Sequence, residues 1–273
     1  QVSRTTIPTV MLTPLSQLLL TTHILTRSTL NSLPTTPTEL TISILLVTTR
    51  LSSVVVVGFS MFMEREKYNH LNKYLKEKFG ERTLKICIDA GFTCPNRDGK
   101  AGTGGCIFCS EKGSGEHIKY NDIETQIKNH LNSYRGERAN KFIAYFQNFT
   151  NTYDSLENLK AKYDAALCDN RIVALAIATR PDCITEDICK LISSYKSKLD
   201  VWVELGLQTS NDKTGEIINR GYSSNQFTNA VKLLNKYNIE TVAHIMVGLP
   251  NEDFEDIKNT VNFLNSHNIQ GLK

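Results

Sequence analysis

The sequence predicts an α/β fold built on a parallel sheet, because strand-like and helix-like segments alternate along most of its 273 residues. The apolar run IVALAIA at 172–178 is typical of a strand buried on both faces, as in parallel sheets. Ser155 and Thr185 each precede a segment with apolar residues at helical spacing, where either side chain can cap a helix. Regular alternation of this kind indicates right-handed strand–helix–strand crossovers.

The expected elements follow one another in a regular order. A first helix is indicated by Tyr68, Leu71, Leu75 and Phe79 at helical spacing, and Gly80 is placed to end it. Strands are expected at 84–89, 142–147, 172–178, 201–207 and within 241–250, and the helices between them at Ser155, Thr185, Ser224 and Asp253. A sixth strand would begin at 270–273, where the given sequence stops, so we expect a C-terminally incomplete domain.

Residues 1–62 differ in composition from the rest of the chain. Residues 1–60 contain no Asp, Lys, Cys, Tyr or Trp, one Glu and one Gly. A targeting segment and a membrane span at 40–62 are the alternatives, but the segment is poor in arginine and Arg50 lies in the middle of the span. We therefore expect 1–62 to be a non-core segment, disordered or not native to the domain, and 63–273 to be the core domain.

Three cysteines surround one glycine-rich loop in the pattern C-x11-C-x2-C, namely Cys94, Cys106 and Cys109. A structural zinc site takes four protein ligands, and His117 or Cys87 could supply the fourth. Plain core thiols are the other ordinary interpretation. Three thiolates without a fourth instead suit an iron–sulfur cluster with one iron left open for a small molecule.

The end of this loop, Cys106-Ile107-Phe108-Cys109, resembles the C-x-aromatic-C of the radical S-adenosylmethionine (SAM) superfamily. Its long first gap resembles one bacterial subfamily of uncharacterised function and, more distantly, the catalytic subunit of Elongator. The resemblance implies a partial (βα)6 TIM-type barrel, here truncated at the sixth strand. It also implies that Cys94, Cys106 and Cys109 hold a 4Fe–4S cluster and that SAM binds beside it.

Further similarities stand at the ends of the expected strands, where parallel α/β folds bind ligands. The segments are QNFTNTY at 147–153, TRPD at 179–182, ELGLQ at 204–208, RGY at 220–222 and GLP at 248–250. Each is weak alone; TRPD in particular could be a structural turn with Asp182 capping the next helix. Together, in order along the chain, they strengthen the resemblance.

The resemblance implies roles for individual residues. Glu204 would accept the ribose hydroxyls of SAM, and Arg220 would pair with its carboxylate, since a guanidinium can do so bidentately. Phe108 and the turn at Gly248 would lie near the adenine. The remaining residues expected in the SAM pocket are Gln147, Thr150 and Asn151, near the amino group, with Arg180 and Gln208.

The implied function is that of an enzyme which cleaves SAM reductively and generates a 5′-deoxyadenosyl radical. An electron donor such as flavodoxin or ferredoxin would then be a partner, and thiolate ligands suit the reducing cytoplasm. RNA is an open substrate class, although a net charge of +3 does not support nucleic-acid or membrane binding. The alternative from a different class is a non-catalytic zinc or iron–sulfur binding module.

Overall fold

The computed structural model describes residues 42–49, 52–59, 68–113 and 122–273. The chain divides into two compact units, 1–69 and 70–273. In the first unit, β1 (Ile42–Thr49) and β2 (Ser52–Phe59) form an antiparallel pair. The many Val, Ile and Thr residues of this hairpin favour strands.

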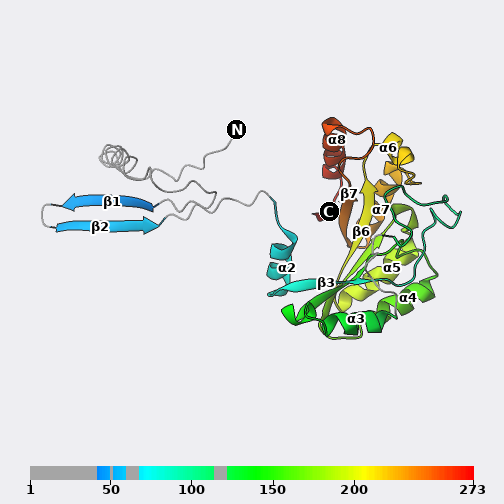
Figure 1. The fold of residues 1–273 in the computed structure, drawn as a ribbon, viewed down its shortest axis with the longest axis horizontal. Helices are drawn as coiled ribbons and strands as arrows, with labels where there is room; N and C mark the ends of the chain where they lie inside the picture. The colour runs from blue at the N-terminus through cyan, green and yellow to red at the C-terminus, as the bar shows by residue number, and fades with distance from the viewer. Residues whose placement is uncertain (1–41, 50–51, 60–67, 114–121) are drawn as a thin grey trace. The chain divides into compact units, whose positions relative to one another are not determined.

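The second unit contains a six-stranded sheet whose strands are all parallel and follow chain order (Figure 1). The strands are β3 (Thr83–Ile88), β4 (Lys141–Phe146), β5 (Ile172–Thr179), β6 (Asp200–Gln208), β7 (Glu240–Ile245) and β8 (Gly271–Leu272). Because β3 and β8 are its two edges, the sheet is unclosed. The predicted α/β fold, an unclosed partial barrel of parallel strands, is confirmed.

Contacts across the sheet show that it is strongly curved. The Nζ atom of Lys273, which follows β8, lies 3.0 Å from the hydroxyl of Tyr145 on β4. Four strand spacings separate β4 from β8, about 19 Å in a flat sheet, which is farther than the two side chains can reach together. The concave face of the sheet therefore encloses an interior, and residues on distant strands meet there.

Helices cover the convex face of this sheet and bury the larger apolar core against it (Figure 1). They are α3 (Ile123–Leu131), α4 (Leu156–Ala165), α5 (Glu186–Ser194), α7 (Ser224–Lys236) and α8 (Phe254–Asn265). The helix α2 (Leu71–Phe79) instead packs Leu75 into the smaller interior cluster with Tyr145 and Trp202. Lys78 of α2 bonds Asp200, the first residue of β6, at 3.0 Å. Helix α2 therefore covers the amino ends of the strands.

The local signals at the helix ends were largely predictive. Ser155, Thr185 and Asp253 cap their helices through side-chain hydrogen bonds, and Gly80 ends α2 at φ 79°. The cap of α7 is Ser223 rather than Ser224, since Ser223 forms a reciprocal capping box with Gln226. The sequence analysis missed α3 and the six-residue helix α6 (Asp212–Ile217).

The segment 40–62, for which a membrane span was the alternative interpretation, contains the two strands β1 and β2. Within the described ranges, no helix is long and apolar enough to cross a membrane. The assignment of 1–62 to a non-core segment remains a prediction.

That boundary can be tested by deletion. A chain shortened to begin at Met63 should keep its unfolding temperature and its capacity to bind iron, because the six-stranded sheet and its helices belong to the unit 70–273. Circular dichroism melts and iron analysis of the two chain lengths provide the comparison. Loss of soluble expression or of iron uptake in the shorter chain would show that the segment belongs to the domain.

Candidate functional site

A cavity of about 510 Å³ opens at the carboxyl ends of the strands, within the range of small-molecule sites. One end is lined by the cysteine loop, including all three predicted ligands, and the other extends into the interior of the barrel to Glu204 and His244. Side chains at or beyond the carboxyl ends of β4, β5 and β6 line its wall, among them Thr150, Arg180 and Gln208. The cysteine loop and the strand ends therefore share one site.

The cysteine loop is fixed to the segment between α6 and α7. The side-chain amide of Asn219 donates to the carbonyls of Gly105 at 2.7 Å and Thr103 at 3.2 Å. The amide of Asn96, buried in the loop, donates to the carbonyl of Asn219 at 2.6 Å and lies 3.6 Å from the sulfur of Cys106. Gly105 has φ +77°, and an added Cβ there would meet Arg97 at 2.8 Å, so a larger residue would disturb the loop.

The three thiols are free and line the cavity together. In the part of the chain that the structure describes, no three His, Cys, Asp or Glu side chains are close enough to hold one metal ion. A zinc ion needs all its sulfurs about 2.3 Å from one point, whereas a cluster offers each thiolate its own iron. Three thiols that line one cavity could supply ligands to either kind of metal centre. Cys87 does not line the cavity, and His117 lies outside the described residues.

The thiol of Cys106 needs compensation before it can act as a thiolate ligand. Burial raises the pKa of Cys106 above its ordinary value, although nearby Arg180 and the amide of Asn96 act in the opposite direction. A bound metal favours the thiolate, because coordination competes with the proton.

Six of the expected SAM-pocket residues line the cavity: Phe108, Gln147, Thr150, Arg180, Glu204 and Gln208. Of these, Thr150 has a buried hydroxyl with no hydrogen-bond partner among the described residues. A buried hydroxyl without a partner is costly, so a ligand that bonds Thr150 would remove that cost. Gln208 has its amide oxygen 2.7 Å from the hydroxyl of Tyr222 and adopts φ +62° at the end of β6, which is strained for a non-glycine residue.

Glu204 lies in the barrel interior, but its carboxylate is already occupied. It is 2% exposed and bonds Lys85, Trp202 at 3.3 Å, His244 at 2.8 Å and Lys273 at 3.2 Å. A carboxylate has about four acceptor positions, so none is left over for ribose hydroxyls. The expectation that Glu204 binds the ribose is not supported by this geometry. We call Lys85, Glu204, His244 and Lys273 the interior charge cluster.

These partners keep Glu204 ionised. Burial alone would raise the pKa of Glu204, but the hydrogen bond with His244 and the charges of Lys85 and Lys273 outweigh it. The pKa of Glu204 consequently lies below its usual range. Burial also lowers the pKa of Lys85, despite the opposing effect of Glu204.

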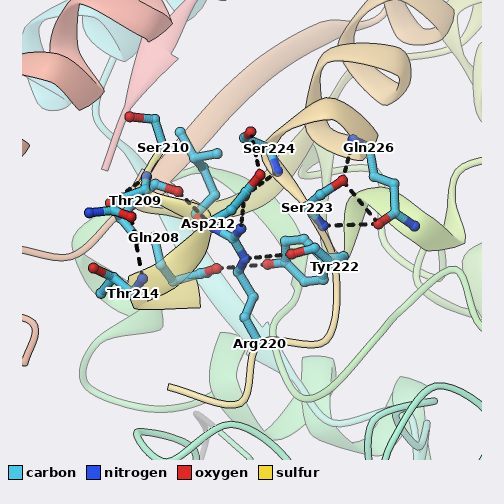
Figure 2. Close-up of polar contacts among 12 residues, drawn as sticks. Gln208, Thr209, Ser210, Asp212, Thr214, Arg220, Tyr222, Ser223, Ser224 and Gln226 are labelled. Carbon is cyan, nitrogen blue, oxygen red and sulfur yellow. Dashed lines mark hydrogen bonds and ion pairs between the residues drawn. The ribbon is translucent and has the colours of Figure 1, made fainter. Parts of the chain in front are cut away.

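Arg220 does not line the cavity, so its geometry does not support the expected pairing with the SAM carboxylate. Its side chain is fully buried and faces its own chain (Figure 2). The guanidinium donates to the backbone carbonyls of Leu207, Thr209 and Tyr222 at 2.6–2.9 Å and pairs with Asp212 at 2.7 Å. These bonds hold the end of β6 to the segment between α6 and α7, to which the cysteine loop is hydrogen-bonded through Asn219.

The TRPD turn has a structural function, although Arg180 touches the cavity. Arg180 binds Asp182 through two hydrogen bonds of 2.9 and 2.7 Å and donates to the carbonyl of Arg220 at 3.0 Å. The guanidinium carbons of Arg180 and Arg220 lie 4.7 and 4.9 Å from the centre of the Tyr222 ring. Asp182 thus pairs with Arg180, and Thr185 rather than Asp182 caps α5.

Asn151 and Gly248 do not line the cavity either. Asn151 is buried and donates to the carbonyls of Phe146 at 3.2 Å and Ala178 at 2.7 Å, which ties the ends of β4 and β5 together. Gly248 has φ +84° in an exposed turn after β7. Asn151 therefore holds backbone in place at the rim of the sheet.

Sequence reasoning missed several residues that line the cavity: Tyr145, Phe149, Tyr222, His244, Met246 and Lys273. His244 and Tyr145 lie within strands that were predicted without a role for either side chain. The available signal was the alternation of side chains along a strand, which puts His244 on the same face as Val242.

Comparison with known proteins decides the family. The family model described as Radical SAM superfamily matches residues 96–264. The chain belongs to the radical SAM superfamily. The uncharacterized protein YtqA of Bacillus subtilis is 39% identical over 213 residues, covering 76% of this chain and 66% of that protein. The uncharacterized protein MJ0486 of Methanocaldococcus jannaschii is 34% identical, covering 73% of this chain and 62% of that protein.

The chain thus spans slightly less than two thirds of the length of these radical SAM relatives. Among solved structures, archaeal Elp3 from Methanocaldococcus infernus aligns over 66% of this chain and 41% of that chain, with 18% identity and a TM-score of 0.47. A similarity of that size carries no argument about function. The family assignment rests on the sequence matches.

Proposed function

We propose that this radical SAM protein is an enzyme in which Cys94, Cys106 and Cys109 hold a 4Fe–4S cluster and SAM occupies the adjoining cavity. The chemistry that the cluster and SAM supply when bound is reductive cleavage of the sulfonium, which yields a 5′-deoxyadenosyl radical. The observation that carries the proposal is that three free thiols of a C-x11-C-x2-C loop line one cavity with the unpaired hydroxyl of Thr150.

The residues of the chain bind and orient the ligand in this proposal. Thr150 accepts a hydrogen bond from the amino group of SAM, and Gln147 lies beside it on the cavity wall. The side chain of Gln208, rather than that of Glu204, forms the hydrogen bonds with the ribose hydroxyls of SAM. The rings of Phe108 and Phe149 line the same end of the cavity and exclude water from the reacting atoms.

The proposal requires a one-electron donor, for which a flavodoxin or ferredoxin is the chemical class. A reducing compartment suits thiolates that must stay free for metal, so we place the enzyme in the cytoplasm. The alternative, a metal-binding module without turnover, differs in one observable: it binds metal but forms no 5′-deoxyadenosine.

Anaerobic reconstitution with iron and sulfide tests the metal assignment. We expect about four irons per chain, as cubane clusters contain. A protein that retains one zinc ion and takes up neither iron nor sulfide would contradict the proposal.

Two variants separate SAM binding from cluster binding. Gln208→Ala and Thr150→Val should each weaken SAM binding by about tenfold, because each removes about one ligand hydrogen bond. Neither side chain belongs to the cysteine loop, so iron content should be unchanged. Glu204→Gln is the comparison, and SAM affinity should change least in this variant. Equilibrium dialysis with labelled SAM measures all three; the reverse order would restore Glu204 as the ribose ligand.

A further inference from the structure

The side chain of Asn96 is fully buried between the cysteine loop and the segment that joins α6 to α7. One N–H group of its amide donates to the carbonyl of Asn219 at 2.6 Å. The amide nitrogen also lies 3.6 Å from the sulfur of Cys106, to which its second N–H group can donate. The backbone carbonyl of Asn96 accepts from Gly105, the residue before Cys106, at 2.9 Å. Asn96 therefore contacts both the backbone and the sulfur at this ligand position.

The orientation of the Asn96 amide follows from its partner. A carbonyl oxygen can only accept, so the amide nitrogen rather than the amide oxygen must face Asn219. The amide oxygen is buried and has no hydrogen-bond partner among the described residues. A Cβ added at Gly102 or Gly221 would lie 2.3 or 2.8 Å from that oxygen, so both glycines leave room for it.

A structural role at this position does not account for the whole amide. An unpaired buried oxygen costs free energy, and an apolar side chain would fill the same space without that cost. The bond to Asn219 uses one of the two N–H groups of Asn96. The second N–H group gains a strong acceptor once the sulfur of Cys106 is a thiolate, because hydrogen bonds to ionised acceptors are the stronger ones.

An N–H group beside a cluster thiolate changes the affinity of the cluster for an electron. A cluster that takes up an electron gains negative charge, and part of that charge lies on its thiolate ligands. A hydrogen bond to such a sulfur is therefore stronger in the reduced state and raises the reduction potential. The Asn96 amide is uncharged, so it adds this effect without adding a charge to the buried loop.

We propose that Asn96 is a positioning residue that donates an N–H···S hydrogen bond to the Cys106 thiolate and so raises the reduction potential of the cluster. The inference rests on the proposed function, in which Cys106 is a ligand of a 4Fe–4S cluster. It adds a residue outside the three cysteines to the control of electron uptake. Because the bond comes from a residue fixed to Asn219, the same contact also sets the position of the sulfur.

A redox titration of the reconstituted cluster, followed by EPR spectroscopy of the reduced state, measures the effect. Asn96→Ala should shift the equilibrium toward the oxidised cluster by about tenfold, a fall in potential of about 59 mV for one electron. Asn96→Asp keeps the shape of the side chain but loses both N–H groups, so its potential should fall at least as far.

Asn219→Gly is the structural control. It removes the side-chain bonds from Asn219 to the carbonyls of Gly105 and Thr103, and glycine accommodates the φ of +51° at this position. The carbonyl of residue 219 still accepts from Asn96, so the amide stays in place. The variant should unfold at a lower temperature and keep the potential of the parent.

The potential separates tuning from a purely structural role, which would lower stability in every variant and the potential in none. If Asn96→Ala carries a cluster with the potential of the parent, the proposal is overturned. An equal fall in potential in Asn219→Gly and Asn96→Ala overturns it as well, because loosening of the loop would then explain both.

Pulsed EPR of the reduced parent decides the question if neither variant of Asn96 assembles a cluster. With the side-chain amide of asparagine isotope-labelled, we expect a hyperfine coupling between one amide nitrogen and the cluster, retained in Asn219→Gly. Absence of this coupling overturns the proposal. None of these measurements needs SAM, so a parent with a cluster that fails to cleave SAM contradicts only the enzyme, whereas a parent that holds zinc instead overturns both.

Discussion

Cys106→Ala should lose nearly all iron on anaerobic reconstitution and form no 5′-deoxyadenosine. The thiol of Cys106 is one of only three candidate ligands in the cysteine loop, so its removal leaves two, too few to hold a cluster that needs thiolates at its corners. Cys94→Ala and Cys109→Ala should behave in the same way. Iron and sulfide analysis, with the visible absorption of the cluster, provides the measurement.

Cys183→Ala is the matched control for these variants. Cys183 lies beside the TRPD turn, outside the cavity that the three ligands share, and burial raises its pKa to about 12, which disfavours the thiolate. Its loss should leave the iron content unchanged. Equal iron loss in Cys183→Ala and Cys106→Ala would show that the ligand set is misassigned.

Arg220→Met should destabilise the fold by about 3–5 kcal/mol, the usual cost of breaking a buried charged network. The substitution leaves the carbonyls of Leu207, Thr209 and Tyr222 without this donor. Asp212 loses its cationic partner and keeps only its hydrogen bonds with Ser224. Unpaired buried groups each cost about 1–3 kcal/mol, which is consistent with that sum after partial relaxation. Urea unfolding of the two proteins measures the difference.

The control for Arg220 is an arginine with the same type of partner at the surface. Arg171 pairs with Asp169 at 2.9 Å, but its side chain is 41% exposed, so Arg171→Met should cost less than about 1 kcal/mol. If Arg220→Met keeps full stability but binds SAM weakly, the guanidinium serves the ligand and the structural assignment is wrong.

The fold could be predicted where its signals are local. Helix caps such as Ser155 and Thr185 act within one helical turn. The apolar run at 172–178 predicts a buried strand without further context. Helix α6 was missed because it has only six residues and no apolar stripe long enough to show a period.

The candidate site was predicted only in part, for a physical reason. The three cysteines lie in one short loop, so their spacing in the sequence was enough to predict that they line one site. Arg220 has the chemistry to bind either a carboxylate ligand or backbone carbonyls, and only its burial decides between them. The interior charge cluster joins Lys85, Glu204 and Lys273, which are far apart in sequence and meet because the sheet curves.

The measurement that tests the central claim most directly is the formation of 5′-deoxyadenosine by the iron-loaded protein, reduced anaerobically in the presence of SAM. The account predicts 5′-deoxyadenosine in the parent and in the surface variant Lys236→Met, a clear reduction in Gln208→Ala, and none in Cys106→Ala. A parent protein that carries its cluster, binds SAM and still releases no 5′-deoxyadenosine under these conditions would contradict the proposed enzyme and favour a metal-binding module.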